Sequence, residues 1–98
     1  MKLNKTILCA DGFSMSVQAR AGAYCTPRVD GAERYTEVEV GYPNRREPLL
    51  MEWAEDPSGP TETVYAWVPA ERITLVVAKH GGIIEGELPP GIAYLPAV

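Results

Sequence analysis

The sequence predicts an α+β fold, with an antiparallel sheet of about four strands and one helix packed on one face of that sheet. Several segments alternate apolar and polar residues with the period of a half-buried strand, and one segment repeats apolar residues with the period of a helix. The chain has 98 residues, which is enough for one domain with a modest core. We therefore expect residues 1–98 to form a single small domain that ends in a proline-rich tail at about residues 86–98.

The first predicted element is a hairpin in residues 5–20, KTILCADGFSMSVQAR. Its second strand alternates apolar and polar residues, so one face is expected in the core and the other in water. The residues expected in the core are Phe13, Met15 and Val17. Asp11 and Gly12 separate the two strands, and this pair favours a tight turn in which both residues have positive φ.

A loop-rich segment follows, and residues 34–43, RYTEVEVGYP, then predict another strand. Thr36, Val38, Val40 and Tyr42 fall on one face, and the valines of that face are expected in the core. The other face is expected to be exposed, and it carries Tyr35, Glu37 and Glu39.

Residues 43–62 form a long connection that is rich in proline. One helical turn is expected within EPLLMEWAED, with Leu49, Leu50 and Trp53 turned toward the core. Connections of this length without internal structure are uncommon in compact domains and often have a function.

Residues 62–68, ETVYAWV, have the β-branched and aromatic content of a strand. Residues 69–80 predict the one substantial helix, because Pro69 suits the first turn and Gly81 suits a left-handed stop. The buried stripe of this helix is expected to consist of Ile73, Val76 and Val77. The β-branched run ITLVV would also suit a strand, but Pro69 and Gly81 at the two ends favour the helix. A short strand is expected near residues 83–85.

The charge balance restricts the classes of partner. The chain has 13 acidic residues against 9 lysines and arginines, a formal charge of −4, so direct binding of nucleic acid is disfavoured. No apolar run approaches the roughly 20 residues that span a bilayer, and the short apolar run near the N-terminus is not a signal-peptide core. We expect a cytoplasmic protein without membrane contact, in which Cys9 and Cys25 are free thiols.

His80, the only histidine, is the first candidate for chemistry. A zinc site needs three or four spaced ligands, and neither this residue nor the two cysteines have that spacing. A nucleophile–base pair of Cys25 with His80 lacks an identifiable orienting residue. We therefore interpret His80 as a helix-terminal residue followed by a glycine cap, and we expect no catalytic residue, no cofactor and no structural metal.

The carboxylates are the second candidate for a functional site. The segment from Glu33 to Glu62 holds most of the acidic residues, with few arginines to oppose them. One interpretation is an acidic protein-binding surface around an exposed aromatic residue. Its members are Tyr35, Glu37, Glu39, Glu52, Trp53, Glu55, Asp56 and Glu62. The alternative interpretation is a solvated sheet face with no partner.

Several segments together resemble a family of small uncharacterised proteins encoded by tailed phages and prophages of proteobacteria. They are DGFSMSVQA, YCTPR, YTEVEVGYP, EDPSGPTETVYAWVP and KHGG, and they span most of residues 5–82. The resemblance implies no catalytic residues. It implies the bacterial host cytoplasm as the compartment and favours a role directed at the host, because small acidic phage proteins include inhibitors of CRISPR and other defence systems.

These observations predict a non-enzymatic phage accessory protein that binds and inhibits a host protein, such as an anti-CRISPR or other anti-defence protein. An acidic surface suits a partner that is basic or itself binds nucleic acid. The alternative is a phage structural or assembly protein that acts as a homo-oligomer, as small as a homodimer, through exposed strand edges and the C-terminal tail. A small enzyme is the third hypothesis.

Overall fold

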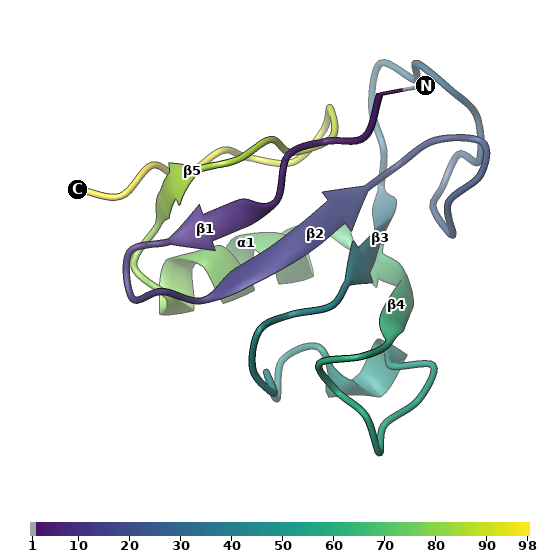
Figure 1. Ribbon diagram of the computed structural model, residues 1–98. Helices are drawn as coiled ribbons and strands as arrows, with labels where there is room; N and C mark the ends of the chain where they lie inside the picture. The colour runs from purple at the N-terminus through teal and green to yellow at the C-terminus, as the bar shows by residue number, and fades with distance from the viewer. Residues whose placement is uncertain (1) are drawn as a thin grey trace.

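The computed structural model describes residues 2–98 and contains a five-stranded antiparallel sheet with one α-helix (Figure 1). The elements are β1 (Ile7–Cys9), β2 (Ser14–Gln18), β3 (Glu37–Gly41), the 3-10 helix η1 (Met51–Trp53), β4 (Val64–Pro69), α1 (Ala70–Lys79) and β5 (Ile83–Glu85). The predicted fold class is confirmed, with five strands where about four were expected. No helix in residues 2–98 is long and apolar enough to cross a membrane.

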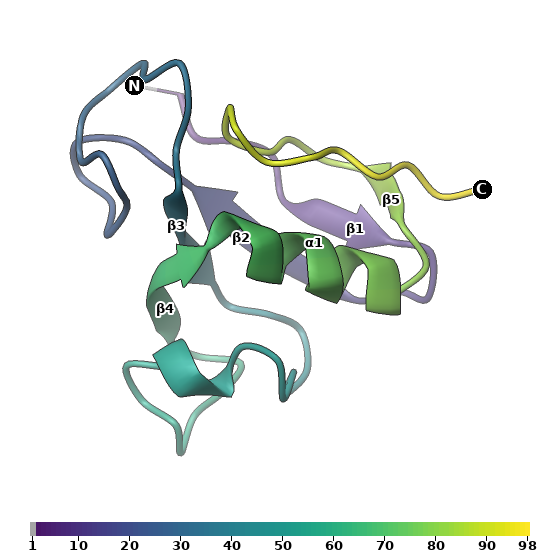
Figure 2. The ribbon, with the colours of Figure 1, turned by 180° about the vertical axis from the view of Figure 1, so that it is seen from behind.

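The order of strands across the sheet is β4-β3-β2-β1-β5. Strands β1 to β4 therefore form a simple meander, whereas β5 lies at the edge opposite β4. The helix α1 connects these two edges and runs across one face of the sheet, which Figure 2 shows from the helix side. The opposite face, toward the viewer in Figure 1, is called the outer face below.

The core lies between α1 and the sheet. Val38 pairs with Val68, and Val17 pairs with Val40, so these cross-strand neighbours fill the helix side of the sheet. The predicted stripe of α1 is buried there, as are the predicted core residues of β2; the buried residues are Ile73, Val76, Val77, Phe13, Met15 and Val17. Pro69 ends β4 and is the N-cap residue of α1, so the helix begins at Ala70, one residue later than predicted.

The hairpin turn differs from the prediction. Only Gly12 has positive φ, at 91°, and Asp11 does not. The N–H of Cys9 donates to the carbonyl of Phe13 at 2.8 Å, which leaves a three-residue loop instead of two. Asp11 takes a second role in this loop, because its carboxylate accepts a hydrogen bond from the N–H of Phe13.

The predicted stop of α1 is confirmed at Gly81, which has a φ of 87°. The N–H of Gly81 donates to the carbonyl of Ala78, and the N–H of Gly82 donates to that of Val77. This pair of bonds is the Schellman arrangement, in which glycine accepts the left-handed conformation without a Cβ clash.

The C-terminal tail is part of the fold. The N–H of Ile83 donates to the carbonyl of Leu95, and the N–H of Ala97 donates to that of Ile83, both at 2.8 Å. The tail thus lies parallel to β5 and covers its free edge. At the other edge, Glu55 donates its N–H to the carbonyl of Val64. The strand edges that homo-oligomerisation was expected to use are therefore at least partly occupied by the chain itself.

The alternation predicted around β3 holds from residue 37 to residue 40 and fails on both sides. Tyr35, predicted exposed, is 2% exposed. Its hydroxyl donates to the carbonyl of Val29 and accepts from the N–H of Ala32, because the preceding loop folds over it. Tyr42, predicted on the valine face, is exposed, because a φ of 50° turns the chain after Gly41.

Candidate functional site

The structure divides the predicted acidic surface into separate parts. Glu37 and Glu39 lie half-buried on the outer face of β3. The other acidic residues are exposed on η1 and on the loop from η1 to β4, and they are Glu52, Glu55, Asp56 and Glu62. Asp56 and Glu62 approach each other around Gly59. Tyr35 joins neither part, because it is buried.

Trp53, the other aromatic residue of the predicted acidic surface, is already in contact with its own chain. It packs half-buried against the core, and the guanidinium of Arg72 from α1 lies over its ring at 5.2 Å. The ring therefore already holds a cation from its own chain. The helical turn predicted in this region is present as η1 and ends at Trp53.

The outer face beside β3 is covered in part by residues 24–26. The N–H of Tyr24 donates to Oε2 of Glu39 at 3.1 Å, and the hydroxyl of Thr26 donates to Oε1 of Glu37 at 2.6 Å. Each carboxylate therefore has one oxygen engaged by this loop. Glu37 and Glu39, expected on an exposed face, are thus half-buried.

A β-bulge in β4 places Trp67 on the outer face. Val38 pairs with Val68 and Val40 pairs with Tyr65, so two residues of β4 oppose the single residue Glu39. Trp67, one of the two, has a φ of 52° and is 43% exposed. A bulky residue in the left-handed region is uncommon and costs backbone strain.

Trp67 belongs to a stack of three side chains. Its ring lies 5.1 Å from the ring of Tyr24 at an interplanar angle of 34°, and Arg28 lies 5.1 Å from the centre of the Tyr24 ring. The N–H of Trp67 donates to the carbonyl of Tyr24, which ties the bulge to the loop. We call the surface formed by Tyr24, Arg28, Glu37, Glu39 and Trp67 the aromatic face.

The sequence analysis missed Tyr24 and Trp67 as site residues. A strict period of two places Trp67 on the same side as Tyr65, which is fully buried. The bulge inserts one residue and moves Trp67 to the opposite side. The usual sequence signal of a bulge is glycine, and Trp67 stands where that glycine would be expected, so no local signal was present.

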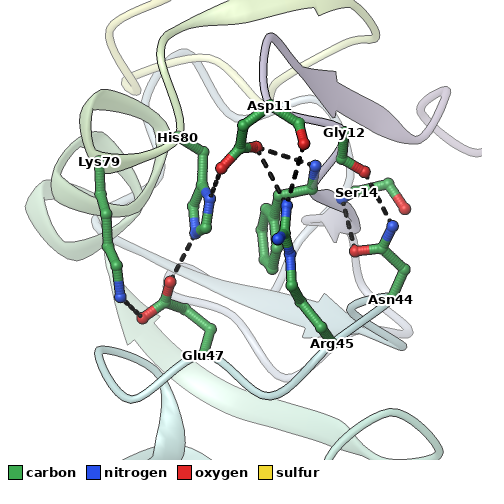
Figure 3. Close-up of polar contacts among 9 residues, drawn as sticks. Asp11, Gly12, Ser14, Asn44, Arg45, Glu47, Lys79 and His80 are labelled. Carbon is green, nitrogen blue, oxygen red and sulfur yellow. Dashed lines mark hydrogen bonds and ion pairs between the residues drawn. The ribbon is translucent and has the colours of Figure 1, made fainter.

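His80, which is buried at the end of α1, lies in a polar cluster that joins the helix end to two loops (Figure 3). Its Nδ1 lies 2.6 Å from Oδ2 of Asp11 in the β1–β2 turn, and its Nε2 lies 2.6 Å from Oε1 of Glu47 in the connection after β3. The imidazole also stacks on Phe13, with centroids 4.1 Å apart. The helix end is thereby fixed to two segments that are distant in sequence.

Both carboxylates of this cluster are fully occupied. Oε2 of Glu47 accepts from Nζ of Lys79 at 2.8 Å and from the N–H of Leu49 at 2.9 Å. Oδ1 of Asp11 accepts from the N–H of Phe13 and pairs with Arg45. Asn44, next to Arg45, holds the turn further, because it bonds to the backbone of Gly12 and Ser14.

Hydrogen bonds within the cluster lower the pKa values of both carboxylates. Hydrogen bonding from His80 and the N–H of Phe13 lowers the pKa of Asp11. Burial by itself raises the pKa of Glu47, but hydrogen bonds from Lys79, Leu49 and His80 outweigh burial and lower it overall. One carboxylate thus lies at each ring nitrogen of His80, Asp11 at Nδ1 and Glu47 at Nε2.

This cluster acts as a structural clamp. Both ring nitrogens of His80 and every oxygen of the two carboxylates have a partner within the chain. The neighbouring thiol of Cys9 is buried, and burial, followed by the charge of Asp11, raises its pKa, which disfavours a thiolate nucleophile. The predicted structural role of His80 extends beyond helix capping to the joining of three segments.

In residues 2–98, no group of three or more His, Cys, Asp or Glu side chains is placed to hold a metal ion. Cys9 and Cys25 are both free and buried. Comparison of the chain with protein-family models, curated proteins and solved structures finds no match.

Proposed function

We propose that this protein works without catalysis of its own, by binding another protein through the aromatic face. The observation that carries this proposal is the exposure of Trp67 in a strained backbone conformation on an otherwise well-packed sheet. Tryptophan is enriched among the residues that dominate binding energy at protein interfaces.

The aromatic face is also organised before any partner arrives. Trp67 is fixed by its stack on Tyr24 and by the hydrogen bond from its N–H to the Tyr24 carbonyl. Tyr24 is fixed in turn by Glu39. A surface ordered in advance loses little conformational entropy on binding, so more of the contact energy appears as affinity.

The His80 cluster supports the non-enzymatic part of the proposal. It is the site in residues 2–98 where a histidine meets carboxylates, and all of its ring nitrogens and carboxylate oxygens are already paired within the chain. General acid–base catalysis needs a group that can exchange its proton with a substrate.

In its biological form, the proposal is a phage accessory protein that binds and inhibits a host protein in the bacterial cytoplasm, as an anti-CRISPR or another anti-defence protein does. The family resemblance supports this role. The acidic balance of the chain supports a basic partner, including one that binds nucleic acid, because opposite charges speed encounter.

The test is capture of partners from a host lysate by the tagged protein, followed by mass spectrometry. Trp67→Asn removes the ring but tolerates the left-handed conformation, so the fold should remain. We expect this variant to lose the captured partner, with affinity at least about 10-fold lower. Tyr94→Ala is the matched control, because Tyr94 is 47% exposed but lies in the C-terminal tail. A partner captured equally by all three proteins would refute the proposal.

A further inference from the structure

We propose that the aromatic face binds an arginine side chain of a basic partner protein. The guanidinium would stack on the exposed side of the Trp67 ring, and the free oxygens of Glu37 and Glu39 would accept its N–H groups. This inference rests on the proposed function and adds the chemistry of the group that is recognised.

The first support is that arginines of this chain lie over three of its other aromatic rings. Arg72 lies over Trp53 at 5.2 Å, Arg45 over Phe13 at 5.8 Å, and Arg28 over Tyr24 at 5.1 Å. In residues 2–98 no arginine or lysine lies over Trp67, although this tryptophan is the more exposed of the two. An arginine from a partner would give Trp67 the contact that Trp53 has within the chain.

The second support is the charge beside the ring. Glu39 lies directly opposite the bulge, and Glu37 lies two residues before it on the same face. In the described part of the chain neither forms an ion pair, and only one oxygen of each accepts a hydrogen bond. Both carboxylates are half-buried, so water screens their charges less than on an open surface.

Arginine suits this arrangement better than lysine. A guanidinium is planar and weakly hydrated, so it can stack on an indole while its edge donates to carboxylates, whereas an ammonium is compact and strongly hydrated. A nucleic acid strand suits it poorly, because on this face two carboxylates without an ion pair outnumber the single cation, Arg28. A basic protein segment that presents arginine is therefore the occupant we assign.

The test is an NMR titration of the ¹⁵N-labelled protein with a blocked peptide that contains three arginines spaced by glycine and serine. The indole N–H signal of Trp67 is identified by its absence in Trp67→Phe. We expect the arginine peptide to shift this signal and the amides of Tyr24 and Glu39. A matched lysine peptide should bind at least about 3-fold more weakly.

Two variants test the role of the carboxylates. Glu39→Gln keeps an oxygen for the N–H of Tyr24 but removes the charge, and it should weaken the arginine peptide by at least about 3-fold. Glu85→Gln is the control, because Glu85 is exposed on β5 at the far edge of the sheet. Charge reversal to lysine is avoided, because it would also remove the acceptor that orders residues 24–26.

Four results would overturn the inference. They are equal binding of the lysine peptide, no shift of the Trp67 signal with the arginine peptide, stronger binding of oligothymidylate, and a shift of that signal with protein concentration alone, which would assign the face to a second copy. Loss of the captured partner in Trp67→Asn together with no response to the arginine peptide would leave the proposed function standing and reject this inference alone.

Discussion

Trp67 combines a backbone conformation that disfavours its side chain with an exposed fraction of 43%. The loop between β2 and β3 holds both features, because Tyr24 in this loop contacts the ring and accepts the backbone hydrogen bond. At this residue the chain accepts a local cost that contributes nothing to the core. Backbone strain of this kind clusters at functional sites, and this is the argument from Trp67 for the proposed function.

The variant Trp67→Asn tests how much the Trp67 ring contributes to the stability of the fold. Asparagine tolerates positive φ, so relief of strain should offset much of the lost stacking on Tyr24. We expect the free energy of unfolding to stay within about 1 kcal/mol of that of the natural protein. Urea denaturation followed by circular dichroism measures this value. A loss of several kcal/mol would show that the ring is a structural residue after all.

His80→Gln should destabilise the protein by about 2 kcal/mol, measured in the same way. Glutamine cannot stack on Phe13, and its amide can donate to only one of the two carboxylates, so the other loses its partner. This expectation replaces the small effect that a helix-terminal histidine implies. Glu85→Gln, on the exposed part of β5, is the control and should unfold as the natural protein does. Partner binding should survive in His80→Gln, because the aromatic face does not use this residue.

At the scale of elements, the β1–β2 hairpin depends on its register. Val17 is fully buried on the helix side of β2, whereas Ser14 is half-buried on the other side. Val17→Asp places an unpaired charge in the core and should abolish cooperative unfolding, whereas Ser14→Asp should retain it. Thermal denaturation of both variants measures the difference. A native-like transition in Val17→Asp would contradict this register.

The junction of β5 with the C-terminal tail depends on Gly82. A Cβ at this position would lie 2.8 Å from backbone atoms of Pro96 and Ala97. Gly82→Ala should therefore displace the tail and speed hydrogen exchange of the Ala97 amide, which donates to Ile83.

Gly12→Ala provides the matched control for this junction. Gly12 has a φ of 91°, close to the 90° of Gly82, but a Cβ there would meet nothing within 4 Å. Both variants carry the cost of a positive φ, and only Gly82→Ala adds the clash. Equal exchange of the Ala97 amide in the two variants would mean that the tail does not depend on close approach to Gly82.

At the scale of the whole molecule, the His80 cluster ties the stability of the fold to pH. The pKa values of Asp11 and Glu47 are lowered from 3.8 and 4.5 in the folded protein. The unfolded chain therefore binds these protons more readily, so both carboxylates stabilise the fold above their unfolded pKa values. That contribution is lost as the pH falls through the lower folded values.

Urea denaturation between pH 7 and pH 3 tests this dependence. We expect the free energy of unfolding to change little down to about pH 5 and to fall steeply below about pH 4. The double variant Asp11→Asn, Glu47→Gln should be less stable at pH 7 and should show a weaker fall. A natural protein whose stability stays constant down to pH 3 would contradict the ionised state of the cluster.

The sequence by itself determined the elements and the class of the fold. Periods of two and of 3.6 residues arise from local backbone geometry, so the buried faces of β2 and α1 could be predicted from the sequence pattern. The end of the helix at Gly81 could also be predicted, because tolerance of positive φ is a property of a single residue. The acidic balance follows from composition, and the expectation of a single domain follows from length.

The tertiary structure alone decided where the site residues lie. His80 meets partners 69 and 33 positions away in the chain, and no local pattern pairs residues at such separations. The bulge that exposes Trp67 depends on a loop folding across β3, and the same loop buries Tyr35. Local preferences fix the direction of a side chain only within its own element; its neighbours depend on how the elements pack, and binding surfaces are made of those neighbours.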